Sequence, residues 1–313
     1  MRLTNYRVNA GAIRVGIVVE GIVLDAMRIL EYFGGDDDSA ALMSGDTTFS
    51  ALNDAVVALR AVAGQAAALV SSDPYNAIVV GSIGDVDLLA PVLRPPKIVC
   101  IGLNYHDHVK EVGLRTPERP HAFAKLPTAL NGPFSPIVYP EGVADKIDYE
   151  AELAVVVGER IRFASEDEAL AKVLGYCVVN DVSARDWQFA PDDQLTLGKG
   201  FDTFFPMGPW LVTSDEITNP QNLGVRSWVN GDIRQDASTS EMVFPVGEIL
   251  AQLSRICTLE AGDIIATGTP AGVAAGRGDE FFLRPGDVVE CEIDQIGKIS
   301  NEVVLPAAIS NHG

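Results

Sequence analysis

The chain has 313 residues, 47% of them hydrophobic, which excludes a disordered protein and allows a sizeable core in two domains. Its 43 acidic residues outnumber its 23 basic residues, so the formal net charge is −20. This charge argues against binding to nucleic acid, whose affinity depends largely on cationic contacts to phosphate.

Nothing near the N-terminus has the pattern of a targeting segment. The apolar run VGIVVEGIVLDAM is interrupted by Glu20 and Asp25, and no small-residue cleavage site follows it. No uncharged stretch reaches the ~18 residues that a transmembrane helix needs. The cysteines stand singly in apolar runs, which favours buried, reduced thiols: Cys100, Cys177, Cys257 and Cys291. We therefore expect a cytoplasmic protein with no membrane partner.

Residues 1–95 are predicted to form a small N-terminal α+β domain. IRVGIVVEGIVLDA predicts two strands that turn at Glu20 and Gly21. MRILEYF predicts a short helix that ends at Gly34, before the acidic turn GDDDS. TFSALNDAVVALRAVAGQAAALV predicts a longer helix rich in alanine. No group of chemically active residues gathers here, so we interpret the unit as an accessory or oligomerisation domain.

The proline cluster of LLAPVLRPPK predicts an extended connection, after which residues 96–313 form the second domain. Short strand-like runs recur there, separated by Gly, Pro, Asn or Asp. SEDEALAKVLG and VGEILAQLSRIC are the two helical interruptions. Strands and helices do not alternate strictly, which argues against a doubly wound sheet. The pattern favours an α+β fold with a mixed, curled β-structure and a few helices packed on it.

The strand DYEAELAVVVG carries carboxylates at alternate positions. Glu150 and Glu152 point to one face, which Ala154 and Val156 continue with apolar groups. Two like charges on a partly buried face repel each other, and a divalent cation bound to both removes the conflict. Asp181 ends another apolar strand and supplies a third carboxylate. An all-oxygen set favours Mg²⁺ or Mn²⁺ over zinc, although E-x-E alone also fits an edge strand with a solvated face.

The stretch IGLNYHDHVKEVG supplies a candidate general base. His108 and Glu111 are three residues apart, so on a short helix they share a face. A carboxylate beside an imidazole fixes its tautomer and raises its basicity. His106 lies two residues before His108 and cannot share that face. The alternative interpretation is a surface histidine in a helical ion pair.

Two further loops offer groups for binding an anion. In LTLGKGFDTF, Lys199 stands between two glycines, which allows close approach to an anion, although an ordinary loop lysine fits as well. The surrounding residues do not match a P-loop. IIATGTPAGV runs from a strand into a tight turn whose hydroxyls and amides could hold a carboxylate, or simply form a turn.

Together these stretches resemble the fumarylacetoacetate hydrolase superfamily. Seven colinear segments within residues 96–305 carry the resemblance: IVCIGLNYHDHVKE, DYEAELAVVVG, VVNDVSARDWQ, LGKGFDTFFPMGPWLV, VNGDIRQ, GDIIATGTPAGV and LRPGDVVECEIDQIG. SARDWQ and GKGFDTF bring the chain near the domain-containing protein 2 branch and similar bacterial acylpyruvases and oxaloacetate decarboxylases. The resemblance implies a mixed β-sandwich roll, a small N-terminal domain and a homodimer.

The resemblance also implies roles for particular residues. Glu150, Glu152 and Asp181 would hold Mg²⁺ or Mn²⁺, and His108 with Glu111 would form the base dyad on a loop over the site. Lys199 would bind and charge-balance the substrate. The keto acid would contact Gln188 and Thr269, and Arg185 matches another motif position. One departure bears on substrate range: some acylpyruvate hydrolases have arginine in the G-x-N-Y turn, where this chain has Leu103.

The main functional hypothesis is hydrolysis of a C–C bond in 2,4-diketo acids, giving pyruvate and a carboxylic acid. His108 would activate the attacking water, and the cation would act as a Lewis acid. Oxaloacetate can bind through the same groups, so a decarboxylase or tautomerase is the leading alternative. Isomerisation of a hydroxymuconate-type acid is another, and a metal-binding scaffold is the alternative that involves no catalysis.

Overall fold

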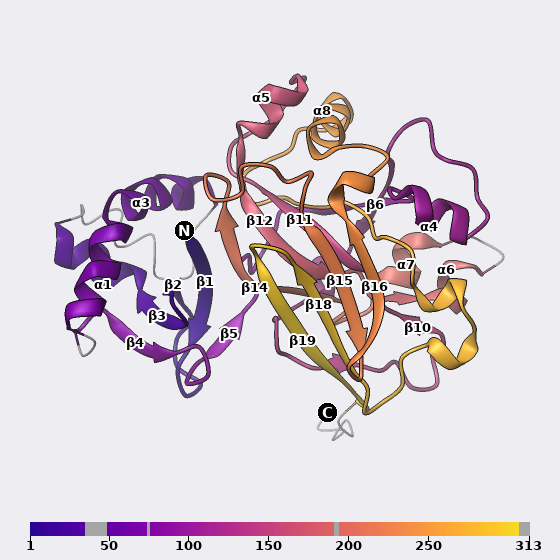
Figure 1. Cartoon of the computed structure of the whole chain (residues 1–313), viewed down its shortest axis with the longest axis horizontal. Helices are drawn as coiled ribbons and strands as arrows, with labels where there is room; N and C mark the ends of the chain where they lie inside the picture. The colour runs from indigo at the N-terminus through magenta and orange to yellow at the C-terminus, as the bar shows by residue number, and fades with distance from the viewer. Residues whose placement is uncertain (35–48, 74–75, 191–193, 307–313) are drawn as a thin grey trace, which may run out of the picture.

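The computed structural model describes residues 1–34, 49–73, 76–190 and 194–306. Figure 1 shows an N-terminal group of strands flanked by α1 (Ala26–Phe33) and α3 (Phe49–Ser72) at one end of the molecule. The opposite end carries α4 (His106–Glu111), α6 (Arg185–Gln188) and α7 (Leu195–Lys199). No described helix combines the length and apolar character needed to cross a membrane.

The N-terminal strands form as the sequence predicts. Strand β2 (Arg14–Val19) pairs antiparallel with β3 (Ile22–Asp25), and the turn residues Glu20 and Gly21 both have left-handed φ angles, of 48° and 80°. Such two-residue turns match the twist of the flanking strands. Helix α1 ends at Gly34, as predicted, with a left-handed φ of 78°. The predicted GDDDS turn lies outside the described residues.

A mixed sheet runs through both parts of the chain. Among the described residues it has 12 strands, in the order β4-β3-β2-β1-β14-β12-β11-β17-β6-β7, with β5 beside β1 and β8 beside β14. Its other members are β1 (Arg2–Arg7), β4 (Val79–Ser82), β5 (Asp87–Leu89), β6 (Ile98–Gly102), β7 (His121–Lys125), β8 (Leu130–Asn131), β11 (Ala151–Val157), β12 (Val173–Asn180), β14 (Phe205–Thr213) and β17 (Ile264–Ala266).

A second sheet packs against the middle of the first. Its order is β16-β15-β18-β19-β9, from β9 (Ile137–Val138), β15 (Gly224–Val229), β16 (Asp232–Ser238), β18 (Val288–Ile293) and β19 (Gly297–Val304). Strand β10 (Ile147–Asp148) pairs with β13 (Ser183–Ala184). In β11, Leu153 and Val155 join the core that includes residues of the second sheet, while Ala154 and Val156 join the core on the other face. The architecture is therefore a sheet-dominated α+β fold.

Most of the predicted helices are confirmed, but one is shorter than predicted. Helix α8 (Val246–Ile256) fills the predicted span. Helix α5 (Glu166–Leu170) begins at a Ser165–Glu168 capping box but ends before residues 173–175, which belong to the fully buried strand β12. Pairing with both β11 and β14 outweighs helical propensity there. The 3₁₀ helices are η1 (Pro127–Ala129), η2 (Thr239–Glu241), η3 (Ala274–Gly276) and η4 (Asp279–Phe281).

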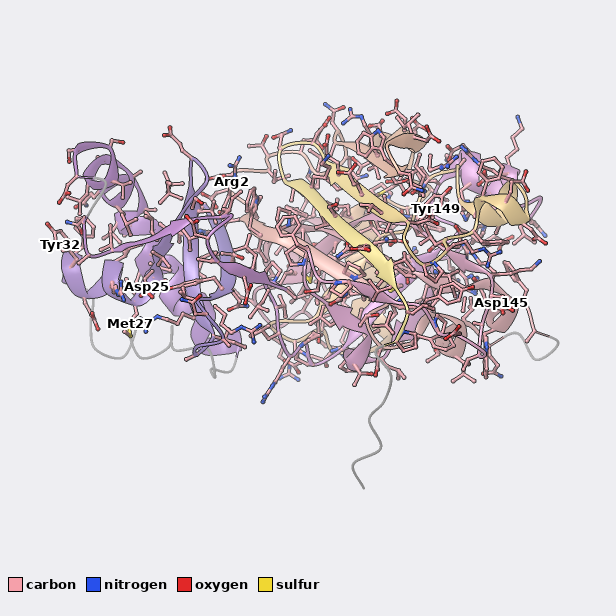
Figure 2. All side chains as sticks on the ribbon, turned by 90° about the horizontal axis from the view of Figure 1, so that it is seen from below. Arg2, Asp25, Met27, Tyr32, Asp145 and Tyr149 are labelled. Atoms are coloured by element: carbon pink, nitrogen blue, oxygen red, sulfur yellow. The ribbon has the colours of Figure 1, made fainter. Side chains whose placement is uncertain are left out.

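Asp25, labelled in Figure 2, ties the N-terminal unit together. Its buried carboxylate caps α1 through the Arg28 amide at 3.0 Å, accepts a hydrogen bond from Tyr6, and pairs with Arg14 at 2.5 Å. Burial acts to raise the pKa of Asp25, but Arg14 and Tyr6 outweigh it and lower the pKa. The resulting stabilisation is present above about pH 4 and is lost as the pH falls through the lowered pKa.

Asp25→Ala is therefore expected to destabilise the protein by about 3 kcal/mol at pH 7, because it leaves partly buried Arg14 without its partner. Chemical denaturation at pH 7 and at decreasing pH measures this, and the difference from wild type should shrink below pH 4. Asp87→Ala is the matched control, because Asp87 makes only an exposed ion pair with Arg7 in the same unit. Equal losses of stability in the two variants would contradict the prediction.

Candidate active site

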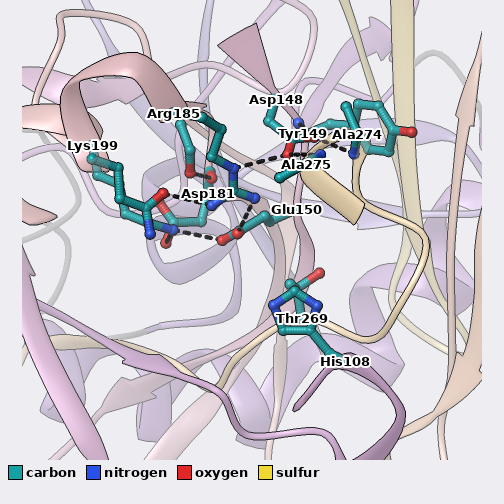
Figure 3. Close-up of polar contacts among 12 residues, drawn as sticks. His108, Asp148, Tyr149, Glu150, Asp181, Arg185, Lys199, Thr269, Ala274 and Ala275 are labelled. Atoms are coloured by element: carbon teal, nitrogen blue, oxygen red, sulfur yellow. Dashed lines mark hydrogen bonds and ion pairs between the residues drawn. The ribbon is translucent and has the colours of Figure 1, made fainter. Parts of the chain in front are cut away.

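A cavity of about 170 Å³ lies where β6 and β11 meet the short helices α4, α6 and α7. Its buried lining residues include the charged Glu150, Glu152, Arg185 and Lys199, which form its closed end. Its exposed lining residues are Leu114, His121, Phe189 and Ala275. The lining residues are Ile101, Gly102, Leu103, His108, Val112, Leu114, His121, Phe123, Glu150, Glu152, Arg185, Gln188, Phe189, Leu195, Lys199, Thr269, Val273 and Ala275. Figure 3 shows the polar network at the closed end.

The fold brings the three predicted acidic ligands together. Glu152 lies in β11, Glu150 directly precedes that strand, and Asp181 directly follows β12. The two strands pair with Ala151 opposite Asn180, and the Asp181 amide donates to the Glu150 carbonyl at 2.9 Å. One carboxylate oxygen of each acid lies within 4.8 Å of the others, and all three side chains are buried.

The charges around these acids are unevenly distributed. Burial acts to raise the pKa of Glu150, but Lys199 and Arg185 outweigh it and lower the pKa to about 2. Burial raises the pKa of Glu152 well above its usual range, and the charges of Asp181 and Glu150 raise it further. Among the described residues no lysine or arginine forms a salt bridge with Glu152, which accepts a hydrogen bond from the Gly268 amide at 2.7 Å.

This arrangement fits a divalent cation. Three carboxylates within reach of one ion form the hard oxygen donor set that Mg²⁺ and Mn²⁺ prefer. A bound cation would also supply the positive charge that Glu152 lacks. Three protein ligands leave about half of an octahedral shell for other oxygen atoms.

Arg185 and Lys199 enclose the acids from the other sides. Arg185 donates through Nε to Asp148 at 2.8 Å, through Nη2 to Glu150 at 2.6 Å and through Nη1 to Gln188 at 2.6 Å. Lys199 lies 2.6 Å from Glu150 Oε2 and 2.8 Å from Asp181 Oδ2. Arg185 thus braces Glu150, and its predicted contact with substrate stays a prediction.

The predicted dyad forms on α4. His108 Nδ1 lies 3.1 Å from Glu111 Oε2, and the other Glu111 oxygen accepts the Gly272 amide at 3.0 Å. Glu111 therefore fastens α4 to the loop that precedes η3 and orients the imidazole. His108 is buried and lines the cavity, whereas His106 is exposed and does not. In Figure 3 no dashed line joins His108 to the network of carboxylates and cations.

The hydroxyl of Thr269 is already engaged by its neighbours. It donates to the Ala151 carbonyl at 3.0 Å and accepts from Gln235 Nε2 at 2.7 Å. Gln188 uses its carbonyl oxygen for Arg185. Both residues line the cavity, where a keto acid could reach them. Their contact with such a substrate stays a prediction.

Sequence reasoning gave no role to two buried charges, Asp148 and Lys125. Asp148 accepts from Arg185 and from the Ala274 and Ala275 amides at 2.8 and 3.0 Å, so it holds η3 near the cavity. Asp148 precedes Glu150 by two residues, so it continues the series of acidic residues at alternate positions that the sequence shows. Lys125 donates to Asp181 Oδ1 at 2.5 Å and to the Val182 carbonyl at 3.0 Å. The one signal in the sequence was that Lys125 alternates with His121 and Phe123 along β7, so the three side chains share a face of the strand.

Comparison with known families agrees with this geometry. The model of the fumarylacetoacetate (FAA) hydrolase C-terminal domain matches residues 97–304. The chain belongs to the fumarylacetoacetate hydrolase family. The resemblance stated from sequence is thereby confirmed. Members of this family are enzymes, and close relatives carry the name oxaloacetate tautomerase.

Three relatives and two solved structures illustrate which activities are named among proteins similar to this chain. The chain is 48% identical over 224 residues to the Xenopus laevis mitochondrial oxaloacetate tautomerase fahd2, covering 71% of this chain and 70% of the relative. The chain is 42% identical to human FAHD2A, in a match that covers 84% of this chain and 78% of the relative. It is 45% identical to Bacillus subtilis YisK, in a match that covers 71% of this chain and 74% of the relative. Both are also named oxaloacetate tautomerases.

A Sphingobium maleylpyruvate hydrolase, solved with manganese(II) and pyruvate, has a TM-score of 0.75 and 30% identity, covering 97% of this chain and 99% of the other. The Exiguobacterium antarcticum fumarylacetoacetate hydrolase has a TM-score of 0.76 and 33% identity, with the same coverage. These findings favour the tautomerase alternative over the main hypothesis of acylpyruvate hydrolysis.

Proposed function

We propose that the protein is a divalent-cation-dependent oxaloacetate tautomerase. The observation that carries the proposal is that one small cavity is lined both by Glu150 and Glu152 of the three-carboxylate cluster and by His108 of the His108–Glu111 dyad. At about 170 Å³ the cavity is smaller than the ~300–1,000 Å³ typical of sites for drug-sized ligands, which suits a short keto acid. Identity of 42–48% to proteins named oxaloacetate tautomerases supports the reaction type.

The dyad would move the proton. With Nδ1–H held by Glu111, Nε2 of His108 is free to take a proton from C3 of oxaloacetate. The negative charge that results rests on the 2-oxygen, and a proton added there gives the enol. A cation at Glu150, Glu152 and Asp181, when bound, supplies Lewis acidity for oxygen atoms of the keto acid. Lys199 adds a second positive charge at the same end of the cavity.

Acylpyruvate hydrolysis remains the second candidate, since several lining residues favour an apolar substituent. Leu103, Val112, Leu114 and Phe189 are apolar lining residues with part of their surface exposed, and they would contact an acyl chain. A structural neighbour is named as a maleylpyruvate hydrolase. Mn²⁺ or Mg²⁺ as the cation, a homodimer and a cytoplasmic location remain predictions.

Three assays on one preparation separate these activities. We expect enol–keto conversion of oxaloacetate, followed by ultraviolet absorbance, to exceed both pyruvate release from oxaloacetate and cleavage of acetylpyruvate in kcat/KM. Controls with free Mn²⁺ and with protein plus EDTA correct for uncatalysed tautomerisation. A larger kcat/KM for acetylpyruvate cleavage would overturn the proposal in favour of the hydrolase.

A further inference from the structure

Lys125 is a buried charge that the proposed reaction does not use. It ends β7, its side chain is 0% exposed, and it is absent from the cavity lining. Burying an ammonium group costs several kcal/mol unless partners offset the loss of water. Its partners are Asp181 Oδ1 at 2.5 Å and the Val182 carbonyl at 3.0 Å, and the Phe205 ring lies 5.5 Å from Nζ.

The two oxygens of Asp181 have different lysine partners. Oδ1 accepts from Lys125, whereas Oδ2 accepts from Lys199, which also contacts Glu150 and lines the cavity. Lys125 therefore holds Asp181 from the side away from the substrate. With Oδ1 fixed there, the carboxylate cannot rotate freely, and Oδ2 stays directed toward the acidic cluster.

The charge balance of the buried cluster gives Lys125 a second effect. Four buried carboxylates, Asp148, Glu150, Glu152 and Asp181, face three buried cationic side chains, Lys125, Arg185 and Lys199. With Glu152 deprotonated, as cation binding requires, the excess without Lys125 would be two negative charges rather than one. Without Lys125 the more negative cluster would attract a cation more strongly, which raises the affinity. Asp181 would also lose the partner that orients it, which lowers the affinity.

We propose that Lys125 is a positioning residue that fixes Asp181 for cation binding. The orienting effect should prevail, because outer partners of metal ligands typically contribute 10–100-fold to metal affinity. The inference rests on the cation site of the proposed function. Lys125 acts through Asp181 and touches neither substrate nor cation.

The test measures Mn²⁺ affinity directly, by electron paramagnetic resonance of free Mn²⁺ in the full-length protein. Lys125→Met is expected to raise the Kd for Mn²⁺ by about 10–100-fold. Saturating Mn²⁺ should restore kcat to within several-fold of wild type, which general misfolding would not allow. Lys125→Gln, whose amide is too short to reach Asp181 from the same backbone position, should show the same loss if the methionine variant fails to fold.

The matched control is Lys97→Met. Lys97 directly precedes Ile98, the residue of β6 that pairs with Lys125, and it forms an ion pair with the buried Asp263. Its loss therefore also leaves a buried aspartate without its partner, but neither Lys97 nor Asp263 lines the cavity. It should lower thermal stability and leave the Kd for Mn²⁺ unchanged. An unchanged or lower Kd in either folded Lys125 variant overturns the inference. Failure of the wild type to bind Mn²⁺ overturns the proposed function instead.

Discussion

Replacing Glu152 with glutamine is expected to stabilise the metal-free protein and to remove most of its activity. The Glu152 carboxylate is buried beside Glu150 and Asp181 and has no salt-bridge partner among the described residues. Glutamine keeps the oxygen that accepts the Gly268 amide, and its own amide can donate to the neighbouring carboxylates. Glutamine is a poor substitute for the charged ligand, so activity should fall at least about 100-fold.

The gain in stability should depend on pH in a defined direction. The pKa of Glu152 is raised in the folded state, so the folded protein retains a proton that the unfolded chain releases above the ordinary pKa of about 4.3. Wild-type stability therefore falls as the pH rises from there toward the folded pKa. In EDTA, the two proteins should unfold alike near pH 4, and Glu152→Gln should be more stable by about 1–3 kcal/mol at pH 8.

Added Mn²⁺ should reverse the order at pH 8. Cation binding requires the deprotonated ligand, so Mn²⁺ should raise the Tm of the wild type and leave that of Glu152→Gln nearly unchanged. Thermal unfolding with and without Mn²⁺ measures both effects. Glu302→Gln, an exposed site in β19, is the control and should behave as wild type. An apoprotein destabilised by Glu152→Gln at pH 8 would show that the carboxylate has another partner.

The parts of the site that sequence predicted are those fixed by local geometry. Strand alternation placed Glu150 and Glu152 on one face, and helical spacing placed His108 next to Glu111. Asp181 joins Glu150 and Glu152 because it directly follows β12, and its position at the end of an apolar strand had already marked it as the third carboxylate. The hairpin at Glu20 likewise depends on neighbouring residues alone.

What sequence did not predict depends on partners distant in the chain. Lys125 meets Asp181 across 56 residues, and Arg185 meets Asp148 across 37. Local spacing carries no information about such pairs, because sheet order decides which strand ends face each other. The shortened helix α5 has the same origin, since pairing of β12 with β11 and β14 decides where the helix stops.

His108→Ala is expected to lower kcat for oxaloacetate tautomerisation by about 10²–10⁴-fold, the usual contribution of general acid–base catalysis. His108 lines the cavity but is not one of the three clustered acids, so the Kd for Mn²⁺ should remain within about threefold of wild type. This combination separates proton transfer from cation binding. Steady-state kinetics at saturating Mn²⁺ and the Mn²⁺ titration measure the two quantities independently.

The neighbouring His106 provides the matched control for this prediction. It occupies the same helix two residues earlier, but it is exposed and outside the cavity, so His106→Ala should keep wild-type kcat. Glu111→Gln should give a smaller loss than His108→Ala, because it weakens the orientation of the imidazole without removing it. Tautomerisation at the wild-type rate in His108→Ala would mean that another group moves the proton, and Lys199, at the closed end of the same cavity, would be the next to test.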